Sequence, residues 1–133
     1  MDRDKEIREL LRTSKVIAVV GLSADEDRPS NGVARYLMKQ GFKIIPVNPG
    51  RDTILGEKSY KSLSDIPGPV DVVDIFMRSD KVLPFVEEAA RLKPKAIWLQ
   101  LGIKNDAAKE AAEKNGIMFV QDRCVKTEHQ RLL

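Results

Sequence analysis

Short apolar runs alternate with longer amphipathic stretches along the chain. The runs are rich in valine and isoleucine, too short for buried helices and often followed by glycine or proline, so each predicts a strand covered on both faces. Five strands are expected, over residues 16–20, 42–47, 70–76, 95–101 and 117–120.

Apolar residues at helical spacing lie between these runs. They predict a surface helix over residues 2–12 and an alanine-rich helix over residues 105–115, which Gly116 ends. Ser30 or Asn31 is the expected N-cap of a further helix, which stops at Gly41.

Three segments complete the assignment. Ser79 is the expected N-cap of a helix that runs through Leu92. Residues 53–69 are predicted to form loops around one short helical turn. The tail from Gln121 onward is assigned no element.

Strands that alternate with helices predict an α/β fold, namely a doubly wound, five-stranded parallel sheet with helices on both faces. A length of 133 residues suits one domain, 1–133. In such sheets the ligand lies beyond the carboxyl ends of the strands, at the switch point beside the first strand. This rule gathers five segments on one rim: residues 21–31, 48–51, 76–79, 100–102 and 121–124.

Charge and hydropathy exclude several functions. The net charge is only +3, acidic and basic residues are interspersed and aromatic residues make up 5% of the chain, so no nucleic-acid partner is expected. No apolar stretch is long enough to span a bilayer, and the first six residues are too charged to begin a signal peptide. We therefore expect a cytoplasmic protein that does not bind membranes.

Candidate catalysts and metal ligands are scarce. Cys124 is the only cysteine and His129 the only histidine, so neither a metal site nor an internal disulfide is expected. Asp71 and Asp74 fall inside a predicted strand rather than at its end. A carboxylate pair inside a strand lacks geometric support for acid–base catalysis. They are expected to pair with Lys or Arg or to bind backbone donors, and no catalytic residue is predicted.

The turn after the first strand carries the strongest signal for a ligand. Gly21 allows a tight bend, and Ser23, Arg28 and Ser30 supply donors beside a helix N-terminus, whose partial positive charge favours phosphate. The second glycine of the dinucleotide fingerprint is missing. Two interpretations fit: a nucleotide phosphate at the turn, or a structural role in which Ser30 or Asn31 caps the helix and Arg28 is solvated.

The end of the second predicted strand argues against NAD. Val47 is followed by Asn48-Pro49-Gly50-Arg51 instead of the Asp or Glu that holds the ribose hydroxyls of NAD. Arg51 either neutralises an additional ribose phosphate, as in NADP sites, or faces water. The ligand therefore has a phosphorylated ribose, or this loop is uninformative.

Taken together and in order, these motifs resemble a known family. They are similar to the stand-alone CoA-binding proteins of bacteria and archaea, relatives of the CoA-binding domain in the α subunit of succinyl-CoA synthetase. The similarity covers nearly the whole chain, and six segments carry it: Gly21–Ser23, Arg28–Ser30, Pro46–Pro49, Val70–Phe76, Trp98–Gly102 and Asp122–Cys124.

The resemblance implies a Rossmann-like fold that binds coenzyme A or an acyl-CoA. By this resemblance, Asn48, Pro49 and Arg51 would border the adenosine and its ribose phosphate. Phe76, Met77 and Arg78 would line the pantetheine path, although Met77 stands where many relatives carry arginine. The diphosphate would be held by Gly21, Leu22, Ser23, Arg28, Ser30 and Asn31, and Gly102 and Cys124 would complete the site.

Binding without ligase chemistry is the predicted function. The synthetase keeps its phosphorylated histidine in a separate domain and its ATP on another subunit, and 133 residues have room for neither. An NADP-dependent oxidoreductase or a CoA-thioester-transforming enzyme is the alternative. A monomer or a homodimer is expected.

Two roles are open for Cys124. Free cysteines are most often small buried residues. At the end of the fifth predicted strand, however, Cys124 would lie on the ligand rim near the CoA thiol, where it could exchange into a mixed disulfide under oxidation.

Overall fold

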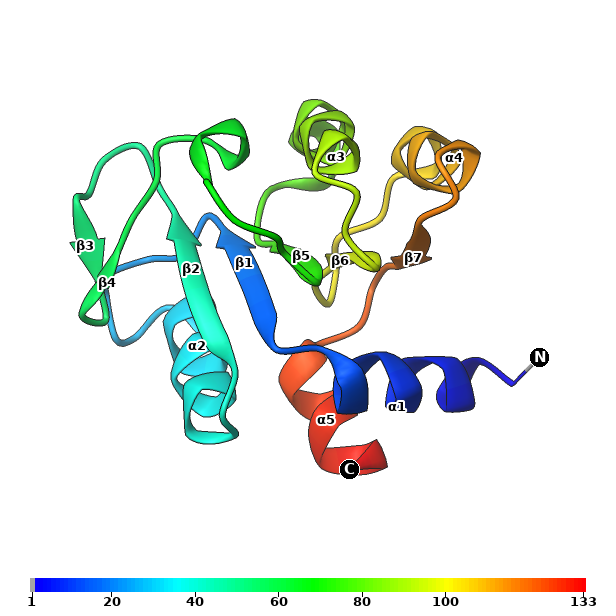
Figure 1. Cartoon of the computed structure of the whole chain (residues 1–133), viewed down its shortest axis with the longest axis horizontal. Coiled ribbons are helices and arrows are strands. Elements are labelled where there is room, and N and C mark those ends of the chain that lie inside the picture. The colour runs from blue at the N-terminus through cyan, green and yellow to red at the C-terminus, as the bar shows by residue number, and fades with distance from the viewer. Residues whose placement is uncertain (1) are drawn as a thin grey trace.

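Five parallel strands form the central layer of the computed structural model, which describes residues 2–133 (Figure 1). All five predicted strands are confirmed, trimmed by up to two residues at their ends. The strands are β1 (Val16–Val20), β2 (Lys43–Val47), β5 (Val72–Ile75), β6 (Ala96–Leu99) and β7 (Met118–Val120).

The strand order is β2-β1-β5-β6-β7. The chain passes from β1 to one side to form β2 and then returns to the other side to form β5, so the switch point lies between β1 and β5. In register, Val20 lies opposite both Val47 and Ile75, so the carboxyl ends of these three strands are level. The predicted doubly wound topology is confirmed.

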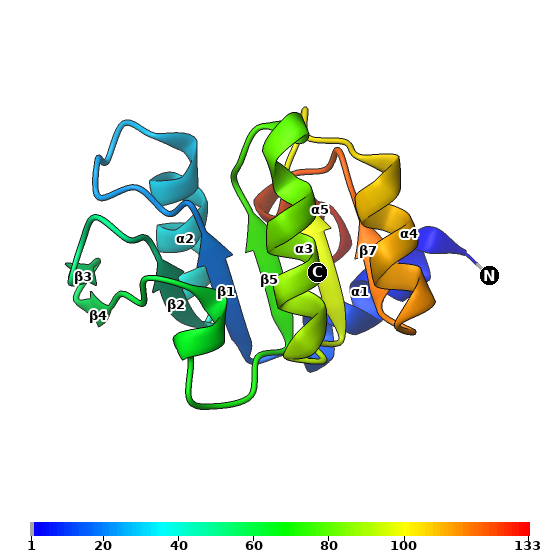
Figure 2. The ribbon, with the colours of Figure 1, turned by 90° about the horizontal axis from the view of Figure 1, so that it is seen from above.

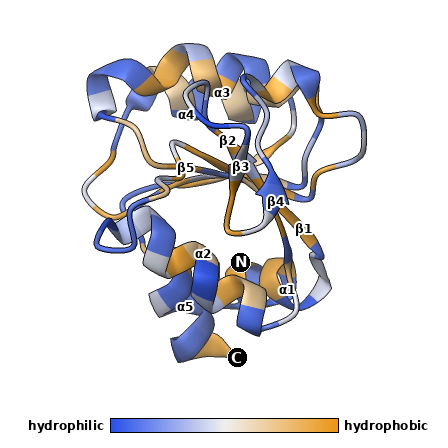
Figure 3. Ribbon diagram, turned by 90° about the vertical axis from the view of Figure 1, so that its left-hand side faces the viewer, coloured by the Kyte–Doolittle hydropathy of each residue, from blue (hydrophilic) through white to orange (hydrophobic). Residues whose placement is uncertain are grey.

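Helices cover both faces of the sheet (Figures 1 and 2). Alternate side chains of β1 point to opposite layers: Ile17 and Val19 pack with one set of helices, Ala18 and Val20 with the other. Figure 3 shows the hydrophobic strands between the two helical layers. One layer holds α1 (Arg3–Thr13), α2 (Pro29–Lys39) and α5 (Val125–Leu132), and the other holds α3 (Val82–Arg91) and α4 (Asp106–Lys114).

Two predicted helix caps are wrong. Helix α2 begins at Pro29, so Ser30 and Asn31 lie inside its first turn and cap nothing. Ser79 opens the 3₁₀ turn η2 (Ser79–Lys81), after which α3 starts at Val82. The Ser79 hydroxyl instead accepts a hydrogen bond from the backbone N–H of Lys104, at 3.0 Å.

The remaining segments add small elements at the sheet edge. Residues 53–69 contain the predicted short helical turn, η1 (Leu63–Asp65), together with a hairpin that was not predicted, β3 (Thr53–Ile54) and β4 (Glu57–Lys58). The unassigned tail forms α5. Among residues 2–133, no helix is both long and apolar enough to cross a membrane.

Candidate functional site

A hollow of about 370 Å³ lies at the switch point, where the loops after β1, β2 and β5 meet the start of α2. Six of its lining residues were predicted from the sequence. The seventh, Pro29, was missed as a site residue, although a proline directly after Arg28 is a common first residue of a helix. The lining consists of Gly21, Ser23, Arg28, Pro29, Ser30, Asn48 and Phe76.

Gly21 joins the loops after β1 and β5. Its φ is +81°, and a Cβ atom there would lie 2.4 Å from the carbonyl oxygen of Phe76. The backbone N–H of Gly21 also donates to Val47, at 3.0 Å. Only glycine fits, because both the dihedral angle and the close approach of Phe76 exclude a side chain.

Ser30 and Asn31 fix the turn that precedes their helix. The Ser30 hydroxyl accepts a hydrogen bond from the backbone N–H of Ser23 at 3.0 Å, and the Asn31 amide donates to the Ser23 carbonyl at 2.9 Å. Both side chains are buried. Ser30 and Asn31, which were predicted as helix caps, thus position Ser23. The Ser23 and Ser30 hydroxyls each accept a hydrogen bond from a backbone N–H, so each hydroxyl proton is still available to donate.

The N-terminus of α2 is not closed by a side chain. Asp2 caps α1 and Asn105 caps α4, but the cap position of α2 is Arg28, which makes no capping hydrogen bond. The first turn of α2 has no acidic residue, and Arg28 is exposed without an ion pair to any residue in 2–133. Pro29 has no N–H, and the N–H groups of Arg28, Asn31 and Gly32 donate to backbone carbonyls. The Ser30 N–H, the helix dipole and the free Arg28 guanidinium therefore concentrate positive charge beside the hollow.

Asn48 connects the loops after β1 and β2. Its amide donates to the carbonyl of Leu22 at 2.9 Å, and its side-chain oxygen accepts from the backbone N–H of Gly50 at 2.8 Å. The Leu22 side chain is fully buried, so this residue offers a ligand only its backbone. Pro49 and Arg51 are exposed on the same loop.

The other predicted site residues lie outside the lining of the hollow. Met77 is half-buried against Gly21, and Arg78 is exposed with its guanidinium 3.3 Å from Asp80. Gly102, after β6, donates its backbone N–H to Asp122 at 2.7 Å. Cys124, after β7, is half-buried. These positions continue the rim from β5 towards β7.

The prediction that Asp71 and Asp74 bind Lys, Arg or backbone donors holds for one of these residues and not for the other. Asp71 behaves as predicted, because its carboxylate accepts hydrogen bonds from the backbone N–H groups of Lys15 and Val16 at 2.8 and 2.9 Å. Burial opposes its ionised form, but these bonds prevail and lower its pKa. For Asp74 the prediction is wrong: it is fully buried, and neither carboxylate oxygen has a hydrogen-bond partner within residues 2–133. Burial raises the pKa of Asp74 well above its ordinary value.

A second hollow, of about 280 Å³, lies along the exposed edge of β2. Val16 and Lys43, the first residues of β1 and β2, line this hollow. It therefore lies towards the amino ends of the strands and away from the switch point. In the described part of the chain, no group of three His, Cys, Asp or Glu side chains is placed to hold a metal ion.

Fold and site together define a Rossmann-like α/β domain with its candidate site at the switch point. The sequence profile of the family described as "CoA binding domain" matches residues 15–130. The chain belongs to this CoA-binding domain family, as the sequence motifs indicated.

Two groups of relatives accompany this match. The uncharacterized protein YneT of Bacillus subtilis is 40% identical over 124 residues, which cover 93% of this chain and 92% of YneT. The ADP-forming acetate–CoA ligase II of Archaeoglobus fulgidus is 34% identical over 115 residues, covering 77% of this chain. The chain matches only 17% of that ligase, so the two share one domain.

Solved structures agree with the fold. A hypothetical protein from Pyrococcus horikoshii OT3 superimposes with a TM-score of 0.95 at 38% identity, covering 98% of this chain and 92% of that one. A protein from Thermus thermophilus, ID.343, gives a TM-score of 0.94 at 38% identity and covers both chains completely.

Proposed function

We propose that this protein is a cytoplasmic, single-domain module that binds coenzyme A, free or as an acyl-CoA, without ligase chemistry of its own. The observation that carries the proposal is the uncapped N-terminus of α2 with the unpaired Arg28 beside it, at the switch point of a chain in the CoA-binding domain family.

The diphosphate is assigned to the hollow. The Ser30 N–H, the Arg28 guanidinium and the hydroxyls of Ser23 and Ser30 are donors of the type that phosphates accept. About 370 Å³ is near the lower end of the range for ligand sites, so the hollow suits the diphosphate and its immediate neighbours rather than the whole of CoA.

The two arms of CoA are assigned to opposite directions along the rim. The adenosine and its ribose phosphate lie over the loop of Asn48, Pro49 and Arg51, where Arg51 has no partner among the described residues. The pantetheine follows Phe76, Met77 and Arg78 towards Gly102 and Cys124. This assignment places the thiol or thioester near the ends of β6 and β7.

The share of the ligases that the chain matches supports the assignment of binding, rather than ligation, to this domain. Among the curated ligases that it matches, the chain spans 14–26% of their length. Their names describe ligases that act on acetate or 4-hydroxybutyrate and CoA. Of those functions, we assign only CoA binding to this domain, and we propose that it acts as a monomer or a homodimer.

Calorimetry on two matched variants tests the phosphate assignment. Arg28→Ala should weaken CoA binding by roughly 1.5–3 kcal/mol, about tenfold to a hundredfold, because it removes a charge-assisted hydrogen bond to phosphate. Arg91→Ala removes the same charge from the last turn of α3, near the amino ends of the strands, and should leave the affinity unchanged. Equal affinities for both variants would refute the assignment.

A further inference from the structure

A third hollow, of about 190 Å³, lies at the free edge of β7, where the sheet ends between α1 and α4 (Figure 1). Three cationic side chains reach it from separate elements: Arg3 from α1, Lys109 from α4 and Arg123 from the loop after β7. Within residues 2–133, no acidic side chain lines this hollow, and it shares no lining residue with the hollow at the switch point. The rest of its lining is Phe119, Val120 and Gln121.

Arg3 is fixed at this hollow by β7 itself. Its guanidinium donates a hydrogen bond to the backbone carbonyl of Phe119, the central residue of β7. The carboxylate of Glu6 lies 3.6 Å from the guanidinium, which is too far for a hydrogen bond. The Arg3 side chain is 40% exposed. Its charge is therefore held at the sheet edge, within reach of a ligand and without a close anionic partner.

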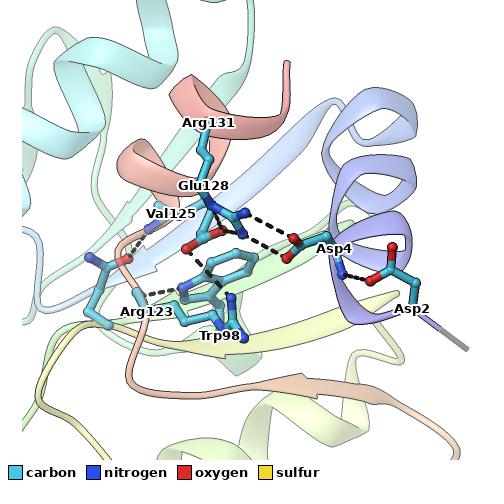
Figure 4. A network of polar contacts seen from close by, with 8 residues as sticks. Asp2, Asp4, Trp98, Arg123, Val125, Glu128 and Arg131 are labelled. Carbon is cyan, nitrogen blue, oxygen red and sulfur yellow. Dashed lines mark hydrogen bonds and ion pairs between the residues drawn. The ribbon is translucent and has the colours of Figure 1, made fainter.

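Arg123 is fixed by β6. Its backbone carbonyl accepts a hydrogen bond from the indole N–H of Trp98 at 2.7 Å, and the N–H of Val125 donates to the side chain of Gln100 at 3.1 Å (Figure 4). The Arg123 guanidinium lies 3.6 Å from the carboxylate of Glu128, which binds another arginine more closely, at 2.5 Å. The Arg123 side chain is 37% exposed. This second guanidinium therefore also keeps hydrogen-bond donors for a ligand.

The other two polar side chains of the hollow add donors. Lys109 is exposed and makes no ion pair with any residue in 2–133. The side-chain oxygen of Gln121 accepts a hydrogen bond from the backbone N–H of Asn105 at 2.9 Å, so its amide N–H groups are left to bind a ligand. The Phe119 carbonyl and the Gln121 oxygen are already used as acceptors, whereas donors remain on four side chains. The partner that such a lining accepts is an anion.

We propose that this hollow is a binding site for a phosphate group. A phosphate dianion matches three cations better than a carboxylate, which carries a single charge, and the fork of N–H groups on each guanidinium suits phosphate oxygens. About 190 Å³ is smaller than sites that enclose a whole drug-sized ligand. The ligand is therefore inorganic phosphate or the terminal phosphate of a small molecule that extends into solvent. The site is separate from the proposed CoA site and does not depend on it.

Titration followed by NMR tests this site apart from the switch point. The native protein is titrated with inorganic phosphate at about pH 8, where phosphate is a dianion. The backbone amide signals of Gln121 and Arg123 should shift saturably, with a dissociation constant of about 1–10 mM. Sodium chloride at the same ionic strength should give no saturable shift there. The amide signals of Ser23 and Ser30 report separately on the hollow at the switch point.

Lys109→Gln and Lys114→Gln are matched variants for this titration. Lys109→Gln should weaken phosphate binding by about threefold to tenfold, because it removes one of the three cations from a side chain without an ion pair. Lys114→Gln removes the same charge from the last turn of α4 and should leave the affinity within about twofold of native. Equal phosphate affinities for the two variants would overturn the assignment.

Glycerol phosphate as a second probe distinguishes the two sources of the phosphate. Binding at least as tight as that of inorganic phosphate supports a phosphate carried on a larger molecule, and weaker binding supports the free ion. If neither probe shifts the Gln121 and Arg123 signals saturably, the phosphate site is overturned, even where calorimetry shows CoA binding at the switch point.

Discussion

Gly21 fixes the geometry of the candidate site at the scale of a single residue. Gly21→Ala should destabilise the fold by about 2–4 kcal/mol, because it adds both left-handed strain and a clash with the Phe76 carbonyl. Gly56→Ala is the matched control, since Gly56 has a similar φ of +77° but open space around it. Urea unfolding should show the smaller loss for Gly56→Ala; equal losses would mean that the contact with Phe76 carries no weight.

Asp74 should cost stability at neutral pH. The unfolded chain ionises this carboxyl near its ordinary pKa of 3.8, whereas the folded chain keeps it protonated to a higher pH. The penalty therefore grows as pH rises above about 4. Asp74→Leu should be more stable than native by about 1–3 kcal/mol at pH 7, with a smaller difference at pH 4, measured by urea unfolding. A destabilised variant at pH 7 would contradict the unpartnered state of Asp74.

Asp71 should act in the opposite direction. Its pKa is lowered in the fold, so its contribution is present above pH 3.8 and is lost as pH falls through the folded value. Asp71→Asn should cost about 1–2 kcal/mol at pH 7, because the neutral amide is a weaker acceptor for the N–H groups of Lys15 and Val16. Thermal unfolding at pH 7 and pH 3 should show this cost shrinking in acid, and a cost that grows in acid would refute the linkage.

At the scale of elements, α5 depends on contacts that are distant in sequence. Figure 4 shows Arg131 between Glu128 of the same helix and Asp4 of α1. The Arg131 guanidinium lies 2.5 Å from the Glu128 carboxylate and 2.7 Å from that of Asp4. Glu128 is buried, whereas the side chain of Asp4 is 41% exposed. The helix is therefore attached through a half-buried network rather than through a broad apolar face.

Glu128→Ala should destabilise the protein by about 2–3 kcal/mol, because it leaves Arg131 and Arg123 without their buried partner. Asp4→Ala removes an exposed carboxylate of the same network and should have a much smaller effect. Urea unfolding of the two variants compares them, and a larger loss for Asp4→Ala would contradict this attachment of α5.

The strands could be predicted from the sequence because their apolar runs are local signals. Helix α5 could not, since its placement depends on Trp98, Gln100 and Asp4, and nothing in its own periodicity identifies them. The α2 cap was wrong for a similar reason: the Ser30 side chain serves Ser23 across the turn. The orphaned state of Asp74 likewise follows from register, which the sequence alone does not reveal.

At the scale of the whole molecule, the predicted site residues fall into two groups. The sequence predicted the rim correctly, because the carboxyl ends of parallel strands share one edge. It could not show that Gly21, Ser23, Arg28, Ser30, Asn48 and Phe76 enclose one hollow whereas Gly102 and Cys124 lie apart from its lining. We propose that CoA spans the two groups, with its diphosphate at α2 and its thiol farther along the rim.

The central claim is that coenzyme A is the ligand, and direct titration of the native protein tests it. Isothermal titration calorimetry with CoA and, separately, NADPH should show saturable one-site binding of CoA and at least about tenfold weaker binding of NADPH, since the second-glycine fingerprint of a dinucleotide site is missing. Tight binding of NADPH with no heat from CoA would contradict the account.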